Sequence, residues 1–217
     1  MWVGVNKNIL YKGAEAEIIL SKYMDRDVIN KKRIPKNYRI KEIDNNLIFS
    51  RTKEESKLIS EARACGVSVP IIYDVDLVNG IISMQYLKGK RIKDILNNIS
   101  EKERHDICIK IGKSIANLHN NNLIHGDITT SNMILFEDKI YFIDFGLGKK
   151  DIEVESKGVD LHVLMEAFES THSKFPKCFD YVMDGYKQNY KKDIKQVIKK
   201  IEDIVRRGRY RWKQFTL

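Results

Sequence analysis

The fold is decided by one stretch of the sequence, which reads His125-Gly126-Asp127-Ile128-Thr129-Thr130-Ser131-Asn132 and then, behind a short apolar hairpin, Ile143-Asp144-Phe145-Gly146. We expect Met133 to Phe136 and Ile140 to Ile143 to form two short strands, because both runs are apolar and Glu137-Asp138-Lys139 separates them as a turn. Such a hairpin brings its two ends together. The polar groups before it and the acidic group after it are therefore predicted to lie side by side.

Three side chains of this stretch have the chemistry of phosphoryl transfer. An Asp followed by four residues and an Asn, then an Asp-Phe-Gly behind a strand, is how kinases arrange that reaction. Asp127 would orient the hydroxyl or water that attacks the γ-phosphate of ATP. Asn132 and Asp144 would bind the Mg²⁺ that neutralises the phosphates. Two ordered motifs at the right separation are far rarer than either alone, so a chance match is the weaker interpretation.

Length and composition limit the protein class. A chain of 217 residues can bury a core and form one compact domain or two small lobes. The net charge of +9 favours an anionic partner. Three cysteines without Cys-x-x-Cys spacing argue against disulfides and zinc. We see neither a signal peptide nor an apolar run of the roughly 20 residues that a spanning helix needs. We therefore expect a cytoplasmic protein without a membrane partner.

The predicted secondary structure changes from mainly strands to mainly helices along the chain. The first part predicts five strands and one helix, at Val5 to Tyr11, Ala16 to Tyr23, Asp27 to Arg33, Ser50 to Cys65 (the helix), Ile71 to Val75 and Ile81 to Gln85. The rest predicts helices at Arg91 to Asn98, after the capping box Ser100-Glu101-Lys102-Glu103, and at Val159 to Glu169, Pro176 to Tyr190 and Lys192 to Arg207.

These elements predict an α+β fold of the bilobal protein-kinase-like type. Residues 1–86 would form the N-lobe, a small antiparallel sheet with one helix. Residues 87–205 would form a reduced helical C-lobe that carries the catalytic loop and the Asp-Phe-Gly. Residues 206–217 would form a basic C-terminal tail.

A kinase also needs a strand lysine that holds the α- and β-phosphates, and a helix glutamate that positions this lysine. We choose Lys31 on the third strand, with Lys32 as the alternative, because a shift of one residue turns every side chain to the other face. For the glutamate we choose Glu55, with Glu54 as the alternative. Each of these residues alone would be read as a solvated charge, and only their order along the chain argues otherwise.

The remaining nucleotide contacts are predicted from position. Gly13 and Ala14 form the turn that would cover the phosphates, although one glycine offers fewer close backbone N–H groups than a glycine-rich loop. Met84, Gln85 and Leu87 stand where the lobes join. There the backbone would meet the adenine edge, with Met84 behind the ring.

These motifs together resemble one kinase family over nearly the whole chain. It is the small atypical serine/threonine kinase of the KEOPS (or EKC) complex, whose members support threonylcarbamoyladenosine formation in tRNA. The motifs that carry the resemblance are Lys31 to Arg39 (its Arg-x-Pro-Lys-x-Tyr-Arg run is the most specific), Arg51 to Glu55, Gly66 to Pro70, His125 to Asn132, Ile143 to Gly148, Val159 to Leu164 with Ser170-Thr171-His172, and Arg207-Gly208-Arg209.

The resemblance implies particular roles and partners. Asp127 would be the catalytic base, Asn132 and Asp144 the Mg²⁺ ligands, and Lys31 with Glu55 the pair that holds the phosphates of ATP. Asp160 would anchor the backbone of the catalytic loop. The partners would be the subunit that transfers the threonylcarbamoyl group to tRNA and the other KEOPS subunits.

The sequence also departs from ordinary protein kinases. Gly126 replaces the arginine that pairs with an activation-loop phosphate, and Lys149 to Gly158 is short for an activation segment. Thr129 replaces a lysine that would face the transferring phosphate. These departures predict a slow kinase or a partner-stimulated ATPase. The basic tail, in which arginines alternate with Tyr210 and Trp212, predicts contact with tRNA or with the partner's active site.

Other classes stay open. A free-standing protein kinase with its own substrate is the first alternative. Small-molecule phosphotransferases of the aminoglycoside or choline kinase type share His-Gly-Asp, but the Asp-Phe-Gly argues against them. It also argues against RIO-type kinases, which we expect to lack it. A non-catalytic adaptor would not explain why every metal and phosphate group is present.

Overall fold

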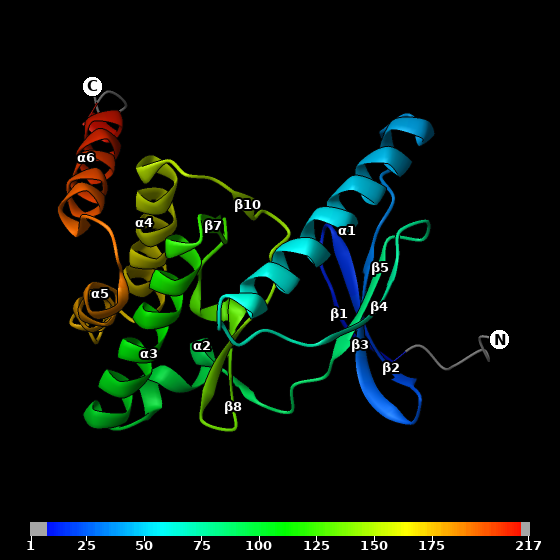
Figure 1. Cartoon of the computed structure of the whole chain (residues 1–217), viewed down its shortest axis with the longest axis horizontal. Coiled ribbons are helices and arrows are strands. Elements are labelled where there is room, and N and C mark those ends of the chain that lie inside the picture. Colours follow the sequence, from blue (N-terminus) through cyan, green and yellow to red (C-terminus); the bar gives the residue numbers. More distant parts are fainter. Residues whose placement is uncertain (1–7, 214–217) are drawn as a thin grey trace.

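The two halves of the chain lie at opposite ends of the long axis of the molecule (Figure 1). The structure, a computed structural model, describes residues 8–213. The N-terminal half contains β1 (Asn8–Lys12), β2 (Ala16–Tyr23), β3 (Arg26–Arg33), α1 (Lys41–Ala64), β4 (Ile72–Asp76) and β5 (Ile81–Gln85). The C-terminal half contains β6 (Lys90–Arg91), α2 (Ile92–Ile95), the 3₁₀ turns η1 (Leu96–Asn98) and η2 (Thr130–Asn132), α3 (Glu101–Asn120), β7 (Leu123–Ile124), β8 (Met133–Phe136), β9 (Lys139–Phe142), β10 (Lys149–Lys150), α4 (Val154–Thr171), α5 (Cys178–Asn189) and α6 (Ile194–Lys213).

The N-lobe is an antiparallel five-stranded sheet in the order β1-β2-β3-β5-β4. Its middle strand, β3, pairs with β2 and β5, and α1 lies along the sheet (Figure 1). Side chains of β3 alternate between the two faces, as in any strand. This alternation decides which basic residue of β3 points toward α1. Of the first predicted strand, residues 5–7 lie outside the described residues.

Helix α1 begins at Lys41, well before the predicted start at Ser50. Its N-cap, Ile40, makes no side-chain hydrogen bond, so the usual sequence signal of a helix start is missing. Asp44 stabilises the first turn instead, because its buried carboxylate accepts the Lys36 N–H at 2.9 Å and the Arg39 guanidinium at 3.1 Å. A carboxylate also suits the positive end of the helix dipole.

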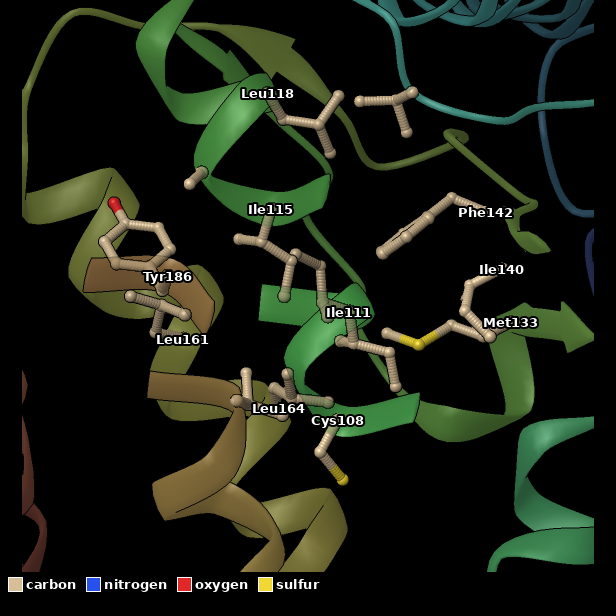
Figure 2. Packing of buried hydrophobic residues seen from close by; sticks show 14 of the residues in the cluster. Cys108, Ile111, Ile115, Leu118, Met133, Ile140, Phe142, Leu161, Leu164 and Tyr186 are labelled. Carbon is tan, nitrogen blue, oxygen red and sulfur yellow. The ribbon is translucent and has the colours of Figure 1, made fainter. Parts of the chain in front are cut away.

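The C-lobe is built around α3. The capping box at its start is confirmed: Ser100 Oγ accepts the Glu103 N–H at 3.3 Å, and Glu103 Oε2 accepts the Ser100 N–H at 2.9 Å. The apolar face of α3 packs between the β8–β9 hairpin on one side and α4 and α5 on the other (Figure 2). The hairpin that precedes Asp144 is therefore fixed on the core.

Helices α3 and α5 are in direct backbone contact. A Cβ atom at Gly112 would lie 1.9 Å from the Val182 carbonyl oxygen, and one at Gly185 would lie 2.2 Å from the Ile109 oxygen. No side chain fits at either position, because Cβ atoms do not approach other heavy atoms so closely. The two glycines let the helices meet without intervening side chains.

Two C-terminal helices are longer than predicted. Helix α4 starts at Val154 rather than Val159, and α6 continues to Lys213, through part of the segment predicted as a tail from Arg206. Glu155 joins the helices, because it pairs with Lys200 and Arg207 at 2.6 Å each. Among the helices that the structure describes, none is long and apolar enough to cross a membrane.

Candidate nucleotide-binding site

A row of three ion pairs between four charged side chains links the N-lobe to the Asp-Phe-Gly segment. Lys31 Nζ lies 2.6 Å from Glu55 Oε1 and 2.6 Å from Asp144 Oδ1. The other oxygen of Glu55, Oε2, lies 2.6 Å from Nη2 of Arg33. Two cations and two carboxylates therefore alternate from β3 through α1 to the loop after β9.

The structure places Lys31 and Glu55, rather than Lys32 and Glu54, at this point. Lys31 is 8% exposed and Glu55 2% exposed, and they contact each other. Lys32 points to the other face of β3, and Glu54 lies on the exposed side of α1. The alternation of the strand and the turn of the helix thus select one residue from each pair.

Two opposing effects set the protonation of Lys31 and Asp144. Burial by itself lowers the pKa of Lys31, but the carboxylates of Glu55 and Asp144 outweigh burial and hold this pKa above its ordinary value. Burial by itself raises the pKa of Asp144, but the Lys31 ammonium and the Gly146 N–H hold it below its ordinary value. Both side chains are therefore charged at neutral pH, as a phosphate-binding lysine and a metal-binding carboxylate must be.

Asp127 and Asn132 form the second part of the site. The side-chain Nδ2 of Asn132 donates to Asp127 Oδ2 at 2.9 Å and to the Asp127 carbonyl at 3.0 Å. Because the amide nitrogen is used in this way, the amide oxygen is the atom that remains for a metal ion. The hairpin returns the chain as predicted, since the Ile143 N–H donates to the Asn132 carbonyl at 3.0 Å.

Asp144 has a left-handed backbone, with φ of +65°. Asp tolerates this conformation better than most residues, although it is uncommon outside glycine. Strained backbone of this kind is concentrated at functional sites, where the surrounding structure imposes it. Here it aims the carboxylate at Lys31.

The backbone of the catalytic loop is held by Asp160, as the family resemblance implied. Its carboxylate accepts the N–H of His125 and of Gly126 at 2.8 Å each, and it lies 3.3 Å from Nε2 of His119. Burial by itself raises the pKa of Asp160, but His119 and the donated hydrogen bonds keep it below its ordinary value. Gly126 has φ of +83°, and a Cβ there would lie 2.2 Å from the Leu147 carbonyl, so the arginine of ordinary kinases cannot stand at this position.

His125 links the two groups of site residues through hydrogen bonds. Its Nε2–H donates to the Ile143 carbonyl at 3.1 Å, so its Nδ1 is free of a proton and accepts the Asp127 N–H at 3.3 Å. Burial lowers the pKa of His125, which keeps the ring neutral and this pattern intact. The histidine thus ties the residue before Asp144 to Asp127.

His172 is a supporting residue whose contacts the sequence does not predict. His172, after α4, lies 2.6 Å through Nδ1 from Asn97 Oδ1 and 3.0 Å through Nε2 from Thr130 Oγ1. Thr130 belongs to the loop that contains Asp127, so His172 holds this loop although it lies 42 residues further along the chain. The sequence marks Ser170-Thr171-His172 only as a family motif, because a lone histidine gives no signal of its contacts.

The predicted nucleotide-covering turn is fixed by polar contacts. Lys36 Nζ donates to the Ala14 carbonyl, and Arg51 pairs with Glu15 at 2.8 Å. The Gly13 N–H donates to the Ala16 carbonyl at 2.9 Å, as in a tight hairpin. The turn is therefore attached to the segment before α1 and to α1 itself.

The structure places Met84 and Gln85 at the end of β5, and Leu87 on the linker that follows. Met84 and Leu87 are buried. The Gln85 N–H donates to the Ile71 carbonyl at 2.8 Å. An adenine edge would therefore have to use other backbone groups of this linker.

The residues present suit a magnesium ion that is shared with phosphates. Within the described part of the chain, no group of three or more His, Cys, Asp or Glu side chains is arranged to hold a metal by itself. Mg²⁺ in kinases needs only one or two protein ligands, because phosphates and waters complete its shell. Asp144 and the amide oxygen of Asn132 are hard oxygen donors of this type.

Lobes, sheet and site together define a protein-kinase-like domain, and comparison with known families agrees. A family model described as "RIO domain" matches residues 7–150. A solved structure, "WaaP in complex with acyl carrier protein", superposes with a TM-score of 0.65, covering 98% of this chain and 90% of that one, at 9% identity. At that identity the likeness shows the fold alone. The RIO match corrects the expectation that Asp-Phe-Gly separates the chain from this class.

Relatives in sequence identify the family within this class. The KEOPS complex subunit Bud32 of Pyrococcus abyssi is 44% identical over 94% of this chain and 96% of its own length. Proteins named probable bifunctional tRNA threonylcarbamoyladenosine biosynthesis protein are 44% identical in Methanobrevibacter smithii and 42% in Methanothermobacter thermautotrophicus, over 94% of this chain. The chain spans only 37% and 36% of those two proteins. The chain belongs to the family of the KEOPS subunit Bud32, within the RIO domain class.

Proposed function

We propose that the chain binds Mg-ATP and acts as an atypical serine/threonine kinase or ATPase. Its assembly would be of the KEOPS type, which supports threonylcarbamoyladenosine formation in tRNA. The observation that carries the proposal is the position of Lys31, 2.6 Å from both Glu55 and Asp144. A lysine held by a helix glutamate beside the Asp of Asp-Phe-Gly is the arrangement that kinases use to bind the phosphates of ATP.

Each residue then has a defined task. Lys31 would bind the α- and β-phosphates, and Glu55 would orient it. Asp144 and the amide oxygen of Asn132 would hold Mg²⁺, which neutralises charge on the phosphates when bound. Asp127 would orient the attacking hydroxyl or water through Oδ1, because its Oδ2 already accepts the Asn132 amide. Gly13 and Ala14 would lie over the phosphates, and Met84, Gln85 and Leu87 along the adenine.

The segment after Asp-Phe-Gly supports slow, partner-dependent turnover. It contains β10 and a short connection, and α4 starts at Val154. Gly126 provides no cation for an activation-loop phosphate. Peptide kinases need a longer segment on which to place the peptide. ATP hydrolysis or autophosphorylation is therefore a better match than phosphorylation of many protein substrates.

The partners are proposed from the relatives. One relative is named as a KEOPS subunit. In another, a region similar to this chain is part of a longer protein that is named for tRNA threonylcarbamoyladenosine biosynthesis. The chain would therefore act beside the threonylcarbamoyl-transferring subunit, with the other KEOPS subunits, in the cytoplasm. Its basic C-terminal segment would contact tRNA.

The test measures ATP hydrolysis and autophosphorylation by the chain alone, with the transferring subunit, and with that subunit plus tRNA. We expect slow turnover alone and a rise when partner and tRNA are present. Turnover that is fast alone and unaffected by both additions would favour a free-standing kinase. Absence of Mg-dependent ATP binding and turnover under all three conditions would refute the proposal.

A further inference from the structure

Arg33 is a second cation on the helix glutamate. Its Nη2 lies 2.6 Å from Glu55 Oε2, and it approaches the Arg51 carbonyl of the same helix at 3.5 Å. Arg33 and Lys31 stand two residues apart on β3, so both side chains point to the face that meets α1. Glu55 therefore uses one oxygen for each cation.

The burial of Arg33 is costly. The side chain is 7% exposed, and its buried Nε has no hydrogen-bond partner among the described residues. A buried donor without an acceptor is unfavourable, and such groups are rare in folded proteins. A residue that only stabilised the fold would be expected to satisfy its donors. The unsatisfied Nε of Arg33 is therefore consistent with a position that serves the site.

The charges of the network show what Arg33 can do. Glu55 is almost fully buried, and a buried carboxylate that loses its only partner is strongly destabilised. Lys31 is shared between Glu55 and Asp144, and phosphates would draw it further from Glu55. Because Arg33 holds the second oxygen, Glu55 remains paired whichever anion Lys31 approaches.

Arg33 also lies against the Asp-Phe-Gly turn. A Cβ atom at Gly146 would be 3.6 Å from Arg33 Nη2, 3.6 Å from Glu55 Oε2 and 3.1 Å from Asp144 Oδ1. The Arg33–Glu55 pair therefore lies close to the turn that presents Asp144, with no room for a side chain at Gly146 that would not touch it. A shift of this pair would be expected to affect both α1 and this turn.

We propose that Arg33 is a positioning residue of the nucleotide site, which keeps Glu55 neutralised and fixes α1 on the Asp144–Gly146 turn so that Lys31 can serve the phosphates. This inference rests on the proposed ATP site and adds to it a residue outside the lysine, glutamate, asparagine and aspartate set. Arg33 touches no substrate in this scheme. It acts through Glu55.

The test uses Arg33→Gln, Arg33→Lys, Glu55→Gln and the double variant Arg33→Gln/Glu55→Gln in the full chain. Lys32→Gln is the matched control, since it removes one positive charge from the neighbouring position on the other face of β3. Two quantities are measured: the Kd of Mg-ATP, and amide hydrogen exchange at residues 51–58 and 144–148 without nucleotide.

We expect Arg33→Gln to weaken Mg-ATP binding by about tenfold or more, as loss of a supporting contact typically does. Exchange should rise in both segments, and Lys32→Gln should change neither quantity. Arg33→Lys should recover part of the affinity, because it restores one donor to Glu55. In the Glu55→Gln background the Arg33→Gln change should add little, since residues that act through one another are not additive.

Equal and multiplicative losses in both backgrounds would show that Arg33 does not act through Glu55, and would overturn the inference. So would unchanged exchange and unchanged Mg-ATP affinity in Arg33→Gln. If exchange rises as expected but no form of the chain, wild type included, binds Mg-ATP, then the proposed function fails while the link from Arg33 to the turn stands.

Discussion

Asp160, on α4 and 34 residues further along the chain, holds the backbone of Gly126, with its Oδ1 accepting the Gly126 N–H at 2.8 Å. The other oxygen accepts the N–H of His125. The Asp160 carboxylate and the His125 contact are buried, and the Gly126 contact is partly buried. The residues just before Asp127 therefore depend on α4 for their conformation.

Replacing Asp160 tests this dependence. Asp160→Ala leaves the buried N–H of His125 and the partly buried N–H of Gly126 without acceptors, so the free energy of unfolding should fall by on the order of 2 kcal/mol or more. Asp160→Asn keeps one oxygen and should lose less. Chemical denaturation measures both variants, with Asp180→Asn on the exposed surface as the control. Equal stability of Asp160→Ala and wild type would show that the contacts do not support the loop.

The two aspartates of the site should have separable effects. Asp144→Ala removes the proposed charged metal ligand, and both Mg-dependent ATP binding and turnover should fall by orders of magnitude. Asp127→Ala should leave ATP binding nearly unchanged and abolish turnover, because the role proposed for Asp127 is to orient the attacking group. Calorimetry and phosphate release measure binding and turnover, with the exposed Asp106→Ala as the control. Full turnover by a folded Asp144→Ala variant would contradict the assignment.

Two neutral histidines should make the stability depend on pH. Burial lowers the pKa of His125 and, together with Lys93 and Arg104, that of His172. In the unfolded chain these rings take up protons as the pH falls below about 6.5, whereas the native rings stay neutral. The unfolded state then binds more protons, so the free energy of unfolding falls with decreasing pH.

Denaturation at pH 7.5, 6.5 and 5.5 should therefore show a progressive loss of stability. His172→Gln should be less stable than wild type at pH 7.5 but should lose less between pH 7.5 and 5.5. A stability that stays level over this range would show that the histidines titrate alike in both states.

The basic C-terminal segment should bind tRNA. Truncation after Arg207 keeps the Arg207–Glu155 ion pair, so thermal stability should change little. Loss of Arg209, Arg211 and Lys213 should weaken tRNA binding and make its salt dependence shallower, since fewer counterions are released. A variant with Lys53, Lys57 and Lys102 changed to Gln removes the same charge elsewhere. Equal tRNA affinity of truncated and full chains at all salt concentrations would refute the role.

Much of the architecture was predictable because local signals agreed with the final packing. The capping box at Ser100 and the apolar face of α3 specified a helix that the structure confirms. The start of α1 was not predictable, since Asp44 caps the first turn through residues that precede the helix and leave no periodic pattern. The extension of α4 to Val154 has no side-chain N-cap either.

The residues of the site also divide into those that the sequence predicts and those that it does not. Motif order placed Lys31, Glu55, Asp127, Asn132 and Asp144, and the structure brings them together in two linked groups. Spacing along the chain could not show Arg33 or His172 as supporting residues. Their contacts join segments that are distant in sequence, and neither residue type carries a signal for such contacts.

The paired glycines of α3 and α5 determine where the molecule can move. Helices that touch through Gly112 and Gly185 have no layer of side chains on which to slide, so we expect α3 and α5 to move as one unit. We therefore expect any change in the distance between the lobes to occur as a hinge motion of the N-lobe about the linker at Tyr86 to Gly89. The Lys31–Asp144 ion pair connects the lobes, and a nucleotide at the proposed site would compete with Asp144 for Lys31.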